Sequence, residues 1–115
     1  MKKIAISLNI NEYKIKTKGN IDNEIISFKD KDGYKTKITY DLKNCVLTRE
    51  NDMILSKMSF KEKENNLEYY LKEQKTRLTD TFKVEKIEKK KNNIKIIYEI
   101  SNNKFDLSLN YEEVK

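Results

Sequence analysis

Apolar and polar residues alternate with a period of two along most of this chain. One apolar series occupies every second position from Ile4 to Ile10, with small or polar residues between its members. This alternation predicts a β-strand with one face toward a core and the other toward water. The same pattern returns in later segments: Ile26/Phe28, Tyr34/Thr36/Ile38/Tyr40, Cys45/Leu47, Ile54/Ser56/Met58/Phe60, Ile94/Ile96/Tyr98/Ile100 and Phe105/Leu107/Leu109/Tyr111.

The second alternating segment follows the first closely but has the opposite phase. Its apolar series is Tyr13, Ile15 and Thr17, and the lysines between them face the other way. A change of phase by one residue requires a bulge or a tight turn between the two segments. We expect it at Asn11–Glu12.

Candidate turns separate the alternating segments. The chain has two glycines and no proline, so we expect Asn and Asp to supply the left-handed backbone positions that turns need. Turns at intervals of roughly 8–12 residues indicate a sandwich or a barrel. The chain is therefore expected to form one antiparallel all-β domain over residues 1–115. The candidate turns are Lys18–Asn20, Asp32–Gly33, Lys43–Asn44, Asn51–Asp52, Asn65–Asn66, Asn92–Asn93 and Asn102–Asn103.

The segment Leu67–Val84 fits two interpretations. Several of its apolar residues fall near helical spacing, and Asn66 is placed to cap a helix there. The alternative uses Leu67/Tyr69/Leu71 and Leu78/Asp80/Phe82/Val84 as two strands, and the threonines of this segment favour it. Periodicity alone leaves helix and strand open.

Several stretches resemble the YwiB-like family of small bacterial proteins in order and spacing, over about residues 4–113. They are Val46–Arg49, Met58–Glu62, Leu67–Tyr70, Ile94–Ile100 and Asp106–Leu109. The resemblance implies an up-and-down, calycin-like (lipocalin-like) β-barrel of about eight strands with no established biochemical function. It favours two strands for the ambiguous segment, and it transfers no catalytic or binding residues.

Composition excludes several chemistries. The chain has no histidine and one cysteine, Cys45, which rules out His-based catalysis, His-ligated metals and an internal disulfide. We expect a protein without enzymatic activity, cofactor or metal. The alternating start at Ile4 indicates a strand rather than a leader, and no apolar run approaches the ~18 residues of a membrane span. A cytoplasmic protein is the resulting expectation.

The net charge of +6 is a weak pointer to function. All but two of the 25 basic residues are lysine, and the two arginines are Arg49 and Arg77. Lysine gives a salt-sensitive attraction to nucleic acid without sequence selectivity. A weakly nucleic-acid-associated protein is therefore one alternative function, and a homodimer or larger oligomer formed through an uncovered strand edge is another.

The candidate ligand site consists of Arg49 and the tyrosines Tyr40, Tyr69 and Tyr98. All four share phases with buried aliphatic residues, so their polar tips require partners. The ligand hypothesis gathers them at one mouth of the barrel, where they orient a small apolar or amphipathic ligand and Arg49 binds its anionic end. Asp80, which shares the phase of Leu78 and Phe82, is a candidate carboxylate partner of Arg49 if no anion is bound. The competing interpretation packs the tyrosines in the core and sends Arg49 to water.

The charge pattern yields a first prediction. Binding to single-stranded or duplex nucleic acid is expected to be weak and to vanish by physiological salt, because lysines without interleaved aromatics provide little beyond counterion release. Fluorescence anisotropy across a salt titration measures this. Sequence-selective binding that survives physiological salt would contradict it.

Overall fold

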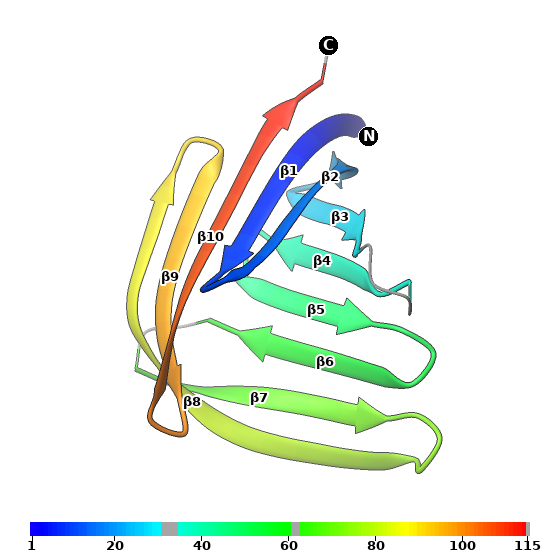
Figure 1. Ribbon diagram of the computed structural model, residues 1–115, viewed down its shortest axis with the longest axis vertical. Coiled ribbons are helices and arrows are strands. Elements are labelled where there is room, and N and C mark those ends of the chain that lie inside the picture. The colour runs from blue at the N-terminus through cyan, green and yellow to red at the C-terminus, as the bar shows by residue number, and fades with distance from the viewer. Residues whose placement is uncertain (31–34, 61–62, 115) are drawn as a thin grey trace.

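The computed structural model is a closed barrel of antiparallel strands (Figure 1). It describes residues 1–30, 35–60 and 63–114. Each strand pairs with its neighbours along the chain, and the first strand also pairs with the last. The strands are β1 (Lys2–Ile10), β2 (Tyr13–Asp22), β3 (Ile25–Lys29), β4 (Lys37–Asp41), β5 (Val46–Glu50), β6 (Ile54–Ser59), β7 (Lys63–Leu71), β8 (Thr76–Lys90), β9 (Asn93–Ile100) and β10 (Asn103–Glu113).

The expectation of an all-β antiparallel barrel is confirmed, but the count of about eight strands is wrong. The described residues form ten strands, because each alternating segment forms a strand of its own, including the five-residue β3, β4 and β5. The ambiguous segment Leu67–Val84 lies in two strands, β7 and β8, which pair with each other. Its threonines and its cross-strand partners outweigh the partial helical spacing.

The long strand β8 joins two differently oriented parts of the barrel. In Figure 1, β3 to β7 run across the view while β1, β9 and β10 run steeply, and β8 curves from one direction into the other. The curve coincides with a bulge between Val84 and Lys86, where one extra residue enters the ladder with β9. A bulge bends its strand and shifts the phase of the side chains. Val84 accordingly faces the interior before the bulge, and Ile87 packs against the core after it.

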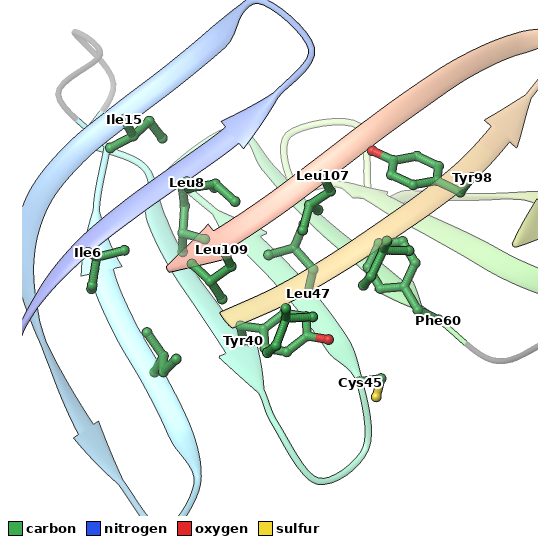
Figure 2. Packing of buried hydrophobic residues seen from close by; sticks show 14 of the residues in the cluster. Ile6, Leu8, Ile15, Tyr40, Cys45, Leu47, Phe60, Tyr98, Leu107 and Leu109 are labelled. Atoms are coloured by element: carbon green, nitrogen blue, oxygen red, sulfur yellow. The ribbon is translucent and has the colours of Figure 1, made fainter. Parts of the chain in front are cut away.

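The interior is filled by one hydrophobic cluster. Ile4, Ile26, Ile38, Ile96 and Leu107 are fully buried within it, and Figure 2 shows side chains from β1, β2, β4, β5, β9 and β10 converging there. Their burial follows the period-two pattern of the sequence, so the inward phase assigned to these segments is confirmed.

Four aromatic rings pack inside the bend of β8. The centroid of Tyr98 lies 5.3 Å from that of Phe60, 5.9 Å from that of Phe82 and 5.2 Å from that of Phe105. The Tyr98–Phe105 pair is stacked, and the others meet at steep angles. Such pairs are worth roughly 0.5–1.5 kcal/mol each beyond their buried area, so this cluster holds the two parts of the barrel together.

Several predicted turns are confirmed, and asparagine supplies their left-handed backbone. Asn11, Asn92 and Asn102 have φ angles of 54°, 63° and 66°, and Asn11–Glu12 forms the expected tight turn between β1 and β2. The predicted turn at Asn65–Asn66 is wrong because both residues lie within β7. The predicted turn at Asp32–Gly33 lies outside the described residues.

The predicted turn at Lys18–Asn20 is also wrong, because Gly19 lies inside β2. The chain turns later, at Asn23 and Glu24, both with left-handed backbone. Gly19 instead serves the contact between β2 and β3: a Cβ atom on it would lie 2.3 Å from the Ser27 carbonyl oxygen. Only a residue without a side chain allows the two strands to approach so closely.

Substitution of Gly19 tests this contact. In Gly19→Ala the new methyl group would also lie 2.7 Å from Ile6 Cδ1 and 2.9 Å from Phe28 Cβ, so β3 must move away. We expect a loss of about 3 kcal/mol in the free energy of unfolding, measured by urea denaturation. The exposed neighbour variant Lys18→Ala should change it by less than about 0.5 kcal/mol. Equal stability of the two variants would contradict the prediction.

Candidate functional site

One end of the barrel carries the connections that follow the odd-numbered strands. Arg49, Tyr69 and Tyr98 all lie within the last three residues of their strands, β5, β7 and β9, so all three approach this end. We call it the Arg49 mouth. Tyr40 lies near the end of an even-numbered strand, β4, and therefore approaches the opposite end.

Arg49 lies on the inward face of β5, as its phase predicted, and its partner is a carboxylate. Its Nη2 atom is 3.5 Å from Oδ2 of Asp30, whose side chain is only 7% exposed. The Tyr13 hydroxyl donates a hydrogen bond to the same Asp30 oxygen. The Arg49 Cζ atom lies 5.8 Å from the centroid of the Tyr13 ring, a cation–π distance. Arg49, Asp30 and Tyr13 thus form one charged cluster at the mouth.

The expected pairing of Arg49 with Asp80 is wrong. Asp80 is exposed, and its carboxylate accepts a hydrogen bond from the Thr81 backbone N–H at 2.7 Å. The reason is the course of β8, whose first half extends beyond the point where β9 joins it. That extension places Asp80 at the margin of the molecule, whereas Asp30 follows directly after β3 and faces the interior.

Arg49 keeps one donor without a partner. Its Nε atom is buried and has no hydrogen-bond partner among the described residues, although the side chain as a whole is 41% exposed. A buried N–H without an acceptor costs about 1–3 kcal/mol. Asp30 therefore anchors the guanidinium group, and the exposed part of the Arg49 side chain remains open to a further acceptor.

The two tyrosines of the mouth lie near this cluster but differ in burial. Tyr98 is 4% exposed, whereas Tyr69 is half-buried and packs against the core. The pKa of Tyr98 is raised to about 12, mainly by burial and in smaller part by Tyr69, while the positive charge of Arg49 acts in the opposite direction. At neutral pH the Tyr98 hydroxyl is therefore uncharged and able to donate a hydrogen bond, and it does not act as a base.

Tyr40 does not share this mouth, so the expectation that all four residues meet at one end is wrong. Figure 2 shows Tyr40 beside the β4–β5 connection that holds Cys45, with Tyr98 on the other side of the cluster. Its ring is 1% exposed, and its hydroxyl has no hydrogen-bond partner among the described residues. Burial and the neighbouring Cys45 thiol raise its pKa well above the ordinary value. Tyr40 is a core residue.

Sequence reasoning missed two residues of this charged cluster. Asp30 continues the inward phase of Ile26 and Phe28 by two residues, and Tyr13 begins the inward phase of β2. Both signals were present in the alternation. The alternation does not show that these residues meet, because only the closure of the barrel brings β2, the end of β3 and β5 together.

Two clefts lie away from this cluster. One of about 960 Å³ runs over the outer face of β1, where the small residues Ala5 and Ser7 lie between Lys16 and Lys18 on one side and Asn110 on the other. The second, of about 670 Å³, lies at the opposite end of the barrel, between the beginning of β1, the β2–β3 and β8–β9 connections and the end of β10. Neither includes Arg49 or the tyrosines of its mouth.

Comparisons with known proteins yield no match among family models, curated proteins or solved structures. Among the described residues there is no helix with the length and apolar character of a membrane span. Those residues also contain no group of three or more His, Cys, Asp and Glu side chains able to hold a metal ion. The case for a function therefore depends on the geometry of the mouth.

The pKa of Tyr98 predicts how stability depends on pH. Because its pKa is raised from 10.0 to about 12, the unfolded chain loses this proton at lower pH than the folded protein does. Between these values the folded state binds more protons, so the free energy of unfolding should fall as the pH rises from about 10 to 12. Urea denaturation at several pH values measures this. Tyr98→Phe should reduce the slope, and an unchanged slope would contradict the assignment.

Proposed function

We propose that this barrel binds a small, largely apolar ligand with an anionic or hydrogen-bond-accepting end at the Arg49 mouth. Arg49 binds the polar end and the Tyr98 hydroxyl donates a further hydrogen bond. The proposed role is binding without catalysis, in the cytoplasm.

The ordered but partly exposed guanidinium group of Arg49 is the observation that carries this proposal. Asp30 and Tyr13 hold the guanidinium group in place, so a ligand would not have to order a long flexible side chain. The Arg49 side chain is still 41% exposed, so a ligand at the mouth can reach it. A charged group that is both held in place and accessible suits a binding site.

The apolar part of the ligand is expected to rest at the mouth rather than deep in the barrel. The interior is occupied by the hydrophobic cluster. Partly buried hydrophobic residues lie at the ends of strands near the mouth: Ile10 at the end of β1, Ile100 at the end of β9, Phe105 near the start of β10, and Tyr69. These side chains offer an apolar rim beside the charge of Arg49, which favours an amphipathic ligand of limited size.

A role without catalysis agrees with the chemistry of the mouth. The chain has no histidine, and Tyr98 holds its proton at neutral pH. The Asp30 carboxylate is engaged by Arg49 and Tyr13. General-base catalysis needs a group whose pKa lies near the working pH, and Tyr98 does not supply one.

We further propose that the chain belongs with the calycin-like barrels and is related to the YwiB-like family. Support comes from the sequence resemblance and from the up-and-down strand order, in which each strand pairs with its neighbours along the chain. The ten strands in the described part of the chain exceed the eight of that expectation. Fold likeness alone does not define a ligand, so the ligand class is argued from Arg49.

A matched pair of dyes tests the proposal. Anilinonaphthalene sulfonate is anionic, and N-phenylnaphthylamine has nearly the same shape without the charge. Arg49→Ala should weaken binding of the anionic dye by about 10-fold or more, since a hydrogen bond to a charged group contributes about 1.5–3 kcal/mol. Binding of the neutral dye should change less than about twofold. Fluorescence titration measures both.

The control for the dye experiment is Lys95→Ala, which removes an exposed cation from the outer face of β9. It should leave both affinities unchanged. If Arg49→Ala and Lys95→Ala weaken the anionic dye equally, the attraction is general surface charge. The binding site at the mouth would then be refuted.

A further inference from the structure

The first half of β8 is an open strand edge. Residues 76–81 pair with β7 on one side, and the ladder with β9 begins only at Lys83. All six residues are exposed, and Leu78 is 49% exposed although it is a large hydrophobic residue. In Figure 1 this half of β8 forms the lower margin of the molecule. Such an edge can accept another strand.

The hydrogen-bond phase shows which backbone groups face outward. Lys72 donates its N–H to the Met53 carbonyl at 2.9 Å, on the β6 side of β7. Because the ladder alternates, Tyr69 and its partner Leu78 bond to each other across β7 and β8. Arg77, Thr79 and Thr81 therefore direct their N–H and C=O groups away from β7. The N–H of Thr81 bonds to the Asp80 carboxylate. The outward N–H groups of Arg77 and Thr79 therefore remain for pairing with another strand.

The other edges near this end of the barrel are protected. Where β10 extends past β1, Asn11 bonds to it: the Asn11 side chain accepts the Asp106 N–H at 2.9 Å and donates to the Lys104 carbonyl at 3.2 Å. The described ladder between β2 and β3 begins only at Asn20. The part of β2 before it carries the exposed lysines Lys14, Lys16 and Lys18. Lysines on an edge discourage pairing. The β8 edge carries Arg77 and Asp80 instead, which balance each other.

We propose that a second copy of this chain pairs with this edge, β8 against β8 in antiparallel orientation, with the two-fold axis at Leu78. In this register the outward groups of Arg77 bond to those of Thr79 in the other copy. The two Leu78 side chains meet, and Thr76 lies opposite Asp80. No like charges stand directly opposite each other, and the Thr81 N–H keeps its bond to Asp80.

The register also predicts a short distance at the axis. Leu78 directs its backbone groups toward β7, so the two Leu78 residues form a non-hydrogen-bonded pair with Cα atoms about 4.5 Å apart. This distance lies within the range that a disulfide spans. A pair of edges this short buries well under the area of a stable interface, so we expect a dissociation constant on the order of 0.1–1 mM.

Cross-linking tests the pairing and its register together. In a Cys45→Ser background, Leu78→Cys should form a disulfide-linked dimer under mild oxidation. Thr81→Cys is the matched control on the same exposed edge: the two Thr81 residues would lie six positions apart in the paired strands, about 20 Å, so it should cross-link at least about 10-fold more slowly. Equal rates for the two cysteines would overturn the proposal.

A backbone variant separates edge pairing from chance collision. Thr79→Pro removes an N–H that points away from β7, so the β7–β8 ladder is preserved, and proline is tolerated on such an edge. It should lower the Leu78→Cys cross-linking rate about 10-fold, whereas Thr79→Val should not. An unchanged rate in a folded Thr79→Pro variant would overturn the proposal.

Sedimentation velocity gives an independent readout on the otherwise unaltered chain. The weight-average mass should rise with concentration up to about 1 mM. Leu78→Asp, which places two carboxylates at the axis, should abolish the rise, and this variant replaces Thr79→Pro if circular dichroism shows that the proline variant is unfolded. A chain that is monomeric at every concentration, or a rise that persists in Leu78→Asp, would overturn the proposal.

Discussion

The closure of the barrel between β2 and β3 is the constraint on which the rest of the structure depends. Only three residue pairs, from Asn20–Ser27 to Asp22–Ile25, join these strands in the described ladder. The Gly19 backbone lies against the Ser27 carbonyl just beyond them, where a side chain would not fit. Because a barrel removes its free edges only when the last pair of strands closes, this short contact determines whether the interior is sealed. The orientation of Asp30 toward the interior, directly after β3, depends on this contact.

The bend of β8 is the second determinant of shape. A bulge after Val84 allows one strand to take part in two differently oriented parts of the barrel. The aromatic cluster around Tyr98 fills the inside of the bend and links the two parts. The same bend carries the first half of β8 past the end of β9. An open edge on one side is thus a direct consequence of how the barrel closes.

The charged cluster at the mouth shows how burial and pairing are balanced. The Asp30 carboxylate is nearly buried, and burying its charge without a cation would cost free energy. Arg49 remains partly exposed. Removing one member of such a pair leaves the other uncompensated, so the pair orders the mouth more than it stabilises the fold. Tyr13 contributes both a hydrogen bond and a ring face to this arrangement. The cluster joins β2, the end of β3 and β5 beyond the three residue pairs of the described β2–β3 ladder.

The sequence by itself determined the strands, the inward phase of their side chains and many of the turns, because these depend on contacts between near neighbours. Alternation placed Ile4, Ile38 and Leu107 in the core, and asparagines such as Asn11 adopt the left-handed backbone expected of them. Only the tertiary structure decided that Gly19 serves a strand contact rather than a turn, that Asp30 rather than Asp80 pairs with Arg49, and that Tyr40 lies at the opposite end from Tyr69 and Tyr98. Those outcomes depend on the register and curvature of strands distant in the chain, which the local period of two does not encode.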